Sequence, residues 1–183
     1  MAALTTPEVA LGFKAIDFAL KGTDEKIHHL HDIAGPKGFI VAFICNHCPF
    51  VKAIIDKMIR DFAELKTYGI NSIAISANDT IAYPDDSFEN MQLWAAQKKF
   101  PFPYVFDETQ AIAKAYGAVC TPDFFGFNAK SELVYRGRLD DSGREQKENT
   151  RRELFEAMRF VAEHQTAPKD QRPSIGCNIK WRE

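Results

Sequence analysis

Apolar positions along the chain fall into short unbroken runs and into longer stretches with three- and four-residue spacing. The run at 38–44 is short and rich in β-branched and aromatic residues, which is typical of a strand buried on both faces. The residues after it have the spacing of one helix face: Val51, Ile54, Ile55, Met58, Phe62 and Leu65. The pattern therefore predicts a buried strand that leads, within a few residues, into an amphipathic helix ending at Gly69.

Turn-forming residues and the same periodicities predict the other elements. We expect a β-hairpin with arms at 13–20 and 26–33, strands at 71–76, 104–106, 123–128 and 132–138, and helices at 86–99, 109–116 and 151–164. Strands that alternate with helices in this order favour an α/β fold with a central mixed sheet and helices on both faces. Residues 166–183 are polar and contain two prolines, so we expect one domain at 1–165 and a C-terminal tail at 166–183 that packs on it.

Composition narrows the class of protein. The chain has 183 residues, of which 45% are hydrophobic and 26% are charged, as expected for one compact globular domain. A net charge of −2 gives no electrostatic reason to bind nucleic acid or an anionic membrane. The sequence has neither a basic segment followed by an apolar stretch at its start nor a run of ~18 apolar residues. We therefore expect a cytoplasmic protein without a membrane segment.

The candidate chemistry lies between the predicted strand at 38–44 and the helix after it, in Cys45-Asn46-His47-Cys48. Unpaired N–H groups and the helix dipole at this position favour a thiolate and lower a cysteine pKa that is ordinarily ~8.5. Half of a zinc site is the alternative, but the sequence has no second CxxC and no HxxxH to complete it. The four cysteines are too few for a disulfide-stapled scaffold, so Cys45 and Cys48 are predicted to form a redox dithiol without a metal or cofactor.

Four segments occur in an order that is found in one known superfamily. They are 43–49 (Phe-Ile-Cys-Asn-His-Cys-Pro), 117–122 (Gly-Ala-Val-Cys-Thr-Pro), 135–141 (Tyr-Arg-Gly-Arg-Leu-Asp-Asp) and 173–181 (Pro-Ser-Ile-Gly-Cys-Asn-Ile-Lys-Trp). Through these segments the chain resembles the thioredoxin-fold superfamily, and within it the peroxiredoxin-like (AhpC/TSA-type) branch that keeps a CxxC. The resemblance covers roughly residues 10–165 and implies a thioredoxin-like three-layer α/β/α sandwich with an N-terminal β-hairpin extension.

The resemblance implies roles for residues in the first two segments. Cys45 would be the exposed nucleophile, and Cys48 would be the buried resolving thiol. The Thr121–Pro122 peptide bond would be cis, with the Thr121 backbone available to pair with a bound peptide. An ordinary trans proline that opens a strand is the alternative interpretation.

Four other residues in these segments have two interpretations each. Arg138, like Arg136, either stabilises the thiolate, as an arginine does in peroxiredoxins, or forms a surface ion pair with an acid at 140 or 141. Cys120 is either an additional redox thiol or a small buried apolar residue. Cys177 is either a resolving thiol or an anchor for the tail.

Two departures from the thioredoxin pattern affect the chemistry. Phe39 lies where thioredoxins bury an acid, so proton transfer would use water, another acid or His47. Asn46-His47 lies between the cysteines in place of Gly-Pro and is closer to the pairs of protein disulfide isomerases. A protonated histidine beside the thiolate stabilises the reduced form, so we expect a reduction potential between about −270 and −180 mV.

The sequence leaves three functional hypotheses. The first is a thiol–disulfide oxidoreductase that uses Cys45 and Cys48, with a protein or small-molecule disulfide as substrate and a thioredoxin or glutathione system as reductant. The second is a peroxiredoxin-like thiol peroxidase, an antioxidant, in which Cys48-Pro49 takes the peroxidatic position, although Val41 and Cys45 replace the proline and threonine of that motif. The third is a thioredoxin-fold module that binds a soft metal through Cys45, Cys48 and one histidine.

Overall fold

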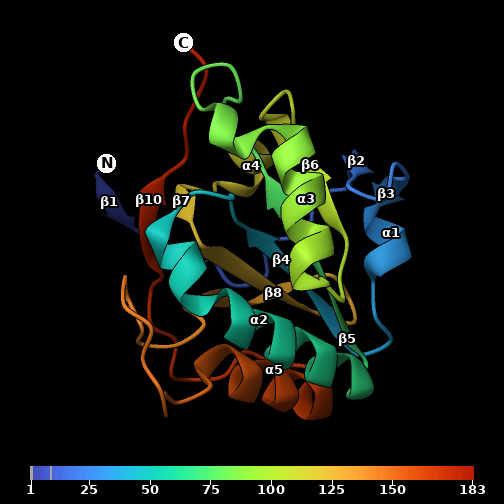
Figure 1. The fold of residues 1–183 in the computed structure, drawn as a ribbon. Helices are drawn as coiled ribbons and strands as arrows, with labels where there is room; N and C mark the ends of the chain where they lie inside the picture. Colours follow the sequence, from blue (N-terminus) through green and yellow to red (C-terminus); the bar gives the residue numbers. More distant parts are fainter. Residues whose placement is uncertain (1, 9) are drawn as a thin grey trace.

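The computed structural model describes residues 2–8 and 10–183, and Figure 1 shows strands and helices alternating along most of this length. The strands are β1 (Ala3–Thr5), β2 (Ala19–Gly22), β3 (Ile27–His29), β4 (Gly38–Phe43), β5 (Ile70–Ser76), β6 (Tyr104–Phe106), β7 (Cys120–Thr121), β8 (Asp123–Asn128), β9 (Leu133–Gly137) and β10 (Ile175–Asn178). The helices are α1 (Leu30–Ile33), α2 (Pro49–Thr67), the short 3-10 helix η1 (Pro84–Asp86), α3 (Phe88–Lys98), α4 (Ala111–Tyr116) and α5 (Glu153–His164).

Seven of the strands form one mixed sheet in the order β3-β2-β6-β5-β4-β8-β9. Strand β4 lies inside this sheet, parallel to β5 on one side and antiparallel to β8 on the other. Helices α2, α3 and α5 contribute to the core on one face of the sheet, whereas α1 and α4 contribute to the core on the other. The predicted three-layer α/β/α architecture around a central mixed sheet is confirmed.

Strand β4 is buried on both faces because each layer of helices covers one set of its alternating side chains. Ile40 and Ala42 pack into the core that contains α2 and α5, and Phe39, Val41 and Phe43 pack into the core on the opposite face. A strand in this position needs apolar residues throughout, which explains the unbroken run. Its carboxyl end leads the chain directly into the CxxC.

The N-terminal hairpin is shorter than predicted, and its second arm ends in a helix. Strands β2 and β3 pair only over 19–21 and 27–29, so the predicted arms at 13–20 and 26–33 are wrong in extent. Helix α1 forms because the carboxylate of Asp32 accepts a hydrogen bond from the N–H of His29, which satisfies a backbone group at the helix start.

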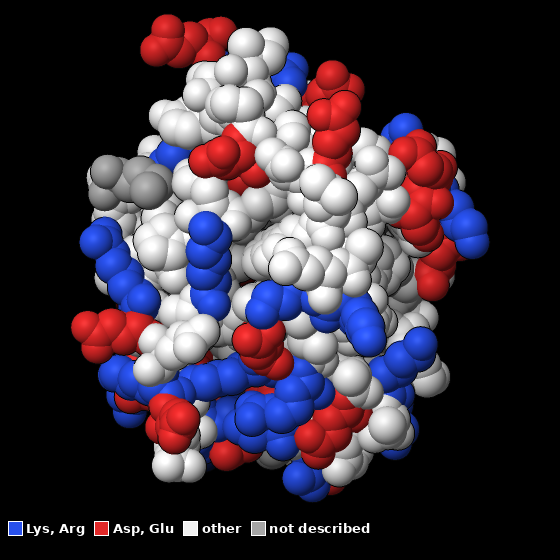
Figure 2. Space-filling view, in the orientation of Figure 1, with Lys and Arg blue, Asp and Glu red and all other residues white. Residues whose placement is uncertain are grey.

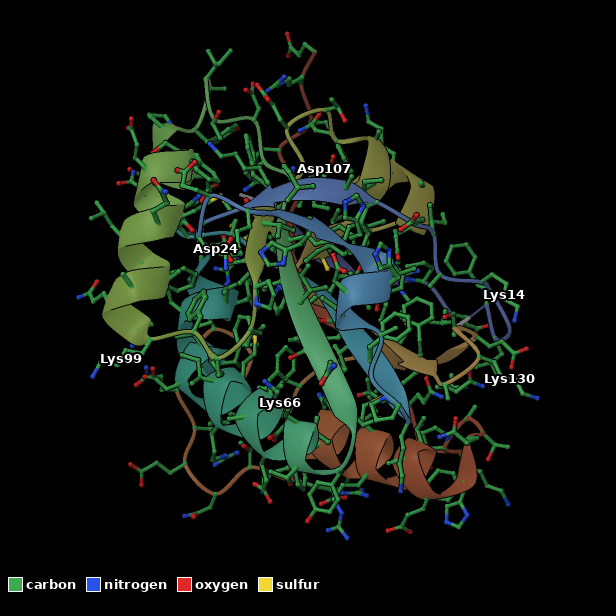
Figure 3. All side chains as sticks on the ribbon, turned by 90° about the vertical axis from the view of Figure 1, so that its right-hand side faces the viewer. Lys14, Asp24, Lys66, Lys99, Asp107 and Lys130 are labelled. Atoms are coloured by element: carbon green, nitrogen blue, oxygen red, sulfur yellow. The ribbon has the colours of Figure 1, made fainter. Side chains whose placement is uncertain are left out.

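The segment before β2 runs beside the turn between β8 and β9 instead of pairing within the hairpin. Lys14 forms an isolated antiparallel bridge with Glu132, and Lys14 Nζ donates to the carbonyl oxygen of Lys130 at 3.1 Å. Figure 3 shows Lys14 and Lys130 at the same end of the molecule. Because these two residues are 116 positions apart, hairpin periodicity does not predict the contact.

The hydrophobic pattern also does not predict a second, three-stranded sheet, which has the order β1-β10-β7. Both of its strand pairs are antiparallel, and β10 lies in the middle. Figure 1 shows this sheet at one side of the molecule, where the two ends of the chain also lie. The C-terminal segment therefore joins the N-terminal strand to β7, the strand that precedes Pro122.

Charged side chains of both signs gather over α2 and α5 in the view of Figure 2. Arg152, at the start of α5, contacts the carboxylates of Asp61 and Glu64 on α2 at 2.7 and 2.6 Å. These ion pairs hold α2 and α5 together. Within the described residues, none of the helices has both the length and the apolar character that crossing a membrane requires.

A buried ion pair fixes the start of β8. Arg136 on β9 donates to both carboxylate oxygens of Asp123, at 3.3 and 2.9 Å, and to the carbonyl oxygen of Gly117 at 2.9 Å. Burial raises the pKa of the Asp123 carboxyl, although its hydrogen bonds with Arg136 act in the opposite direction. Asp123 directly follows Pro122, so this pair holds the loop between β7 and β8 in place.

We expect Arg136→Met to lower the free energy of unfolding by about 3–5 kcal/mol, because Asp123 would remain buried without its cation. Lys98→Met is the matched control, since Lys98 pairs with Asp56 at the surface. A surface pair of this kind contributes about 0–1 kcal/mol. Urea unfolding of the two variants measures the difference, and equal losses would contradict the role assigned to the Asp123–Arg136 pair.

Candidate functional site

The CxxC follows β4 directly and leads into α2, which begins at Pro49 with Cys48 as its N-cap residue. This is the predicted position at a strand-to-helix junction. Both cysteines are buried, with exposed fractions of 1% for Cys45 and 0% for Cys48. The expectation of an exposed Cys45 is therefore wrong, because Thr121 and the loop that carries Asp86 pack around the motif.

Thr121 lies beside both sulfur atoms of the CxxC. Its hydroxyl oxygen is 3.5 Å from Cys45 Sγ, and its carbonyl oxygen is 3.1 Å from Cys48 Sγ. The Thr121–Pro122 peptide bond is cis, as predicted. The Thr121 backbone is not available to a bound peptide, however, because it pairs with Cys177 in β10.

The two thiols of the CxxC have opposite electrostatic surroundings. A hydrogen bond with Cys45 lowers the pKa of Cys48 to about 5 against the opposing effect of burial, and the Cys177 thiol also favours the Cys48 thiolate. The same hydrogen bond raises the pKa of Cys45 well above its usual value, together with burial and the negative charge of Asp86. The carbonyl oxygen of Thr121 favours a protonated Cys48, but the donors around the sulfur outweigh it. These surroundings favour the thiolate form of Cys48 over that of Cys45.

Cys177 is a third thiol in the same site. It lies in β10, near the C-terminus, and its sulfur is 3.0 Å from Cys48 Sγ. Burial, and then the hydrogen bond with Cys48, raises the pKa of Cys177 to about 12, so this side chain is a protonated donor at neutral pH. Cys45, Cys48, Cys120 and Cys177 are all present as unbonded thiols.

Cys120 and Arg138 lie outside this group of three sulfurs. Cys120 is buried on β7, and its Sγ is 3.6 Å from the carbonyl oxygen of Pro122. Burial raises the pKa of Cys120, as expected for a thiol that packs as a small apolar group. Arg138 makes a bidentate pair with Glu153 at 2.9 and 2.8 Å, instead of contacting the thiolate or the acids at 140 and 141 as predicted.

Asp86 is the acidic residue of the site, and no sequence motif points to it. Its Oδ1 accepts hydrogen bonds from the backbone N–H groups of Asn46 at 2.8 Å and His47 at 3.3 Å, and its Oδ2 accepts one from Asn78 Nδ2 at 2.7 Å. The residue is fully buried at the end of η1. The sequence places Asp86 at the start of the helix predicted at 86–99, whereas Ser87 is the residue that caps α3.

The loop that carries Asp86 also orients the two central side chains of the CxxC. His47 Nδ1 is 2.6 Å from Asp86 Oδ2, at an angle that does not make a directed hydrogen bond. The His47 ring stacks on Tyr83 with the ring centroids 6.0 Å apart. Asn46 Nδ2 donates to the carbonyl oxygen of Asp85 in this loop at 3.1 Å, and Asn46 Oδ1 accepts a hydrogen bond from the Tyr104 hydroxyl of β6 at 2.9 Å. The buried acid that β4 lacks is thus supplied by Asp86, from the region after β5.

Cys45, His47 and Asp86 bring one ligand atom each within 4.8 Å of one another. This set differs from the predicted soft-metal set, which contains Cys48 in place of the carboxylate. Both oxygens of Asp86 already accept hydrogen bonds from Asn46, His47 and Asn78. The carboxylate therefore positions the CxxC loop, and we assign no metal to this cluster.

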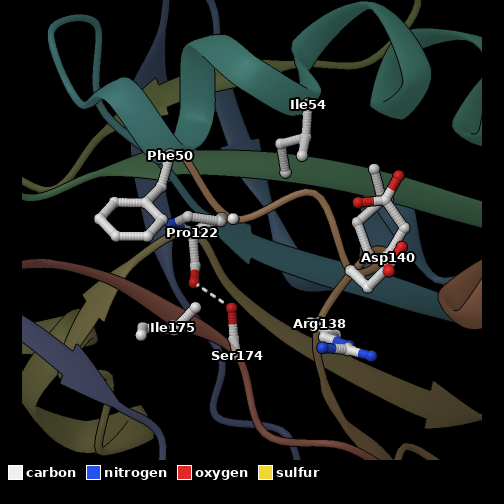
Figure 4. A pocket seen from close by; sticks show the side chains of 10 residues that line it. Phe50, Ile54, Pro122, Arg138, Asp140, Ser174 and Ile175 are labelled. Carbon is white, nitrogen blue, oxygen red and sulfur yellow. Dashed lines mark hydrogen bonds between the residues drawn. The ribbon is translucent and has the colours of Figure 1, made fainter. Parts of the chain in front are cut away.

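A pocket of about 200 Å³ lies between the first turns of α2 and the segment around Pro122 and Ser174. Phe50 of α2, Pro122 and Ser174 are among the residues that line it, and Arg138 and Asp140 add charged groups. Figure 4 shows the Ser174 hydroxyl donating to the Pro122 carbonyl oxygen, at 2.6 Å. Pro122 adjoins Thr121 and Phe50 is two residues beyond Cys48, so the pocket neighbours the CxxC region, although none of the four cysteines is among the residues that line it.

The chain is similar to proteins of the thioredoxin-fold superfamily. The model of the AhpC/TSA family matches residues 11–137. Thiol-disulfide oxidoreductase ResA from Halalkalibacterium halodurans is 26% identical over 123 residues, which cover 67% of this chain and 65%, just under two thirds, of that protein. An uncharacterized conserved protein from Geobacillus kaustophilus is 41% identical, with a TM-score of 0.94 over 100% of this chain and 97% of the other. The thioredoxin domain of a thiol-disulfide oxidoreductase from Bacteroides vulgatus, 17% identical, has a TM-score of 0.59 over 70% of this chain and 89% of its own, which shows the thioredoxin fold.

The lowered pKa of Cys48 predicts that the reduced protein loses a thiolate at acidic pH. Ultraviolet thiolate absorbance should fall as the pH decreases, with a midpoint of about 5, because protonation of Cys48 removes the thiolate. Cys48→Ser should abolish this transition. Cys120→Ser, which changes a buried thiol outside the group, should retain it. A transition that survives in Cys48→Ser and is lost in Cys45→Ser would show that the charge belongs to Cys45.

Proposed function

Because the chain belongs to the AhpC/TSA family, we propose that it is a thiol–disulfide oxidoreductase whose redox couple is formed by Cys45 and Cys48. The observation that carries the proposal is the position of the two thiols at the β4–α2 junction, where Thr121 contacts both sulfur atoms at 3.5 and 3.1 Å. The surroundings lower the pKa of Cys48 and raise that of Cys45. A dithiol with one thiolate at neutral pH is the reduced form from which disulfide exchange starts. The similarity to a named thiol-disulfide oxidoreductase supports the same chemistry.

The proposed reaction transfers two electrons from the dithiol to a substrate disulfide. The proton between the two sulfurs moves from Cys45 to Cys48, and the Cys45 thiolate attacks one substrate sulfur, whose bond to the other substrate sulfur breaks. Cys48 then loses its proton and attacks Cys45 Sγ, so that the Cys45–Cys48 bond forms and the second half of the substrate leaves. Each leaving sulfur takes up a proton. A thiol reductant, such as a thioredoxin or glutathione system, returns the protein to the dithiol.

In this proposal His47 passes protons between the pair and the solvent. Its side chain is 15% exposed, whereas both cysteines are buried. Asp86 holds the imidazole close to Cys45 Sγ, and Tyr83 covers one face of the ring. The same arrangement lets the site exchange protons without exposing either sulfur to bulk water.

We expect Cys45→Ser to reduce insulin disulfides roughly 10³-fold more slowly, or not at all, because the attacking sulfur is gone. Cys48→Ser should also lose turnover, but it should accumulate a mixed disulfide between the substrate and Cys45, which mass spectrometry detects. Cys120→Ser is the control and should retain the wild-type rate. Full turnover by Cys45→Ser would refute the proposal.

Peroxide reduction at Cys48 is a second candidate, and the lowered pKa of this thiol favours it. The Cys48 thiolate would attack one peroxide oxygen, break the O–O bond and form a sulfenic acid while the other oxygen leaves as water or an alcohol. The Cys45 thiol would then attack the Cys48 sulfur, which releases water and forms the same Cys45–Cys48 disulfide. The thiol reductant would again restore the dithiol.

The two cysteine variants should differ in how they react with peroxide. Cys48→Ser should stop peroxide consumption, because no thiolate remains to attack. Cys45→Ser should still form the sulfenic acid at Cys48, which a dimedone adduct detects. Peroxide consumption by Cys48→Ser at the wild-type rate would exclude the second candidate.

A further inference from the structure

The C-terminal strand occupies the exposed edge that β7 would otherwise present. Cys177 pairs with Thr121 and Asn178 pairs with Cys120, in antiparallel register. A cysteine in an extended peptide would have to lie along the same edge to bring its sulfur to Cys48. The chain thus places one of its own cysteines where a peptide thiol would bind.

Contacts on both sides of Cys177 hold its sulfur in this place. Before it, the Ser174 hydroxyl donates to the Pro122 carbonyl oxygen at 2.6 Å. After it, the N–H of Lys180 donates to Asn78 Oδ1 at 2.9 Å. These anchors leave Cys177 Sγ 3.0 Å from Cys48 Sγ, with only 2% of the residue exposed.

Gly176 allows the strand to approach this closely. A Cβ atom at this position would overlap the carbonyl oxygen of Thr121, so any larger residue would push β10 away from β7. The absence of a side chain at 176 therefore sets the distance between Cys177 and Cys48.

We propose that Cys177 is a second exchange partner of Cys48, so that the oxidised protein holds its disulfide either as Cys45–Cys48 or as Cys48–Cys177. The inference rests on the redox couple proposed above and extends it to a third thiol. It gives the C-terminal strand the role of an internal thiol that competes with Cys45 for the bond to Cys48.

The exchange is an isomerisation that needs no external oxidant or reductant. Starting from the Cys45–Cys48 disulfide, Cys177 loses its proton and its thiolate attacks Cys48 Sγ. The Cys48–Cys177 bond forms, the Cys45–Cys48 bond breaks, and the electron pair goes to Cys45 Sγ, which takes up a proton. The product has a free Cys45 thiol and a covalent bond between β10 and the start of α2.

The wild-type protein tests this directly. It is oxidised in a glutathione buffer and quenched with acid, and its remaining thiols are alkylated after denaturation. Because each isomer leaves a different thiol free, we expect the label to divide between Cys45 and Cys177. Label on Cys177 with none on Cys45 would overturn the proposal.

Cysteine variants test which two sulfur atoms form the proposed second disulfide. Cys45→Ser should form an intramolecular Cys48–Cys177 disulfide under the same oxidation. The double variant Cys45→Ser/Cys120→Ser should form the same disulfide. The double variant Cys45→Ser/Cys177→Ser should instead carry a glutathione adduct on Cys48. Gly176→Val keeps all four thiols but separates the strands, so the Cys48–Cys177 isomer should decrease by about tenfold or more as the effective concentration of Cys177 falls, while Cys45–Cys48 remains.

The outcomes separate this inference from the proposed function. A protein that reduces insulin while Cys45→Ser forms only a glutathione adduct at Cys48 would retain the function and overturn the inference. A protein in which Cys48 bonds to Cys177 but never to Cys45 would support a role for Cys177 and refute the Cys45–Cys48 couple.

Discussion

The contact between the Thr121 carbonyl oxygen and Cys48 Sγ sets the geometry of the site. At 3.1 Å it joins the start of α2 to β7, while the Thr121 hydroxyl approaches Cys45 and the Thr121 backbone pairs with Cys177. Thiols from a strand end, a helix start and the C-terminal strand therefore meet at one residue. The buried Asp123–Arg136 pair begins two positions further along the chain, so the stability of this corner of the sheet and the spacing of the sulfurs depend on each other.

Burial gives the site its electrostatic character. A thiolate out of contact with water is costly unless donors surround it, and the thiols of Cys45 and Cys177 supply that stabilisation to Cys48. The carboxylate of Asp86 has the opposite effect on Cys45, whose pKa it helps to raise. The negative charge is thereby directed to one sulfur of the CxxC, and the half-buried His47 lies between the pair and the solvent.

The parts of the molecule that could be predicted from the sequence have local signals. The unbroken apolar run at 38–44 and the helical spacing after it place Cys45 and Cys48 at a strand-to-helix junction, and the Thr-Pro segment points to Thr121. Asp86 could not be predicted, and the segment at 173–181 left Cys177 as either a resolving thiol or an anchor for the tail, because the contacts of both residues span the chain. Asp86 reaches the CxxC loop from 40 residues away and Cys177 from 129 residues away, and neither position follows from periodicity. The path of the loop after β5 sets the position of Asp86, and the pairing of β10 with β7 sets that of Cys177.

A glutathione redox titration of the wild-type protein, with mass-spectrometric mapping of all four cysteines, tests the central claim that Cys48 is the common centre of the redox thiols. The account predicts a reversible disulfide that always includes Cys48, with Cys45 or Cys177 as its partner, while Cys120 stays reduced throughout. A Cys48 that remains unpaired across the titration, or that pairs with Cys120, would contradict it.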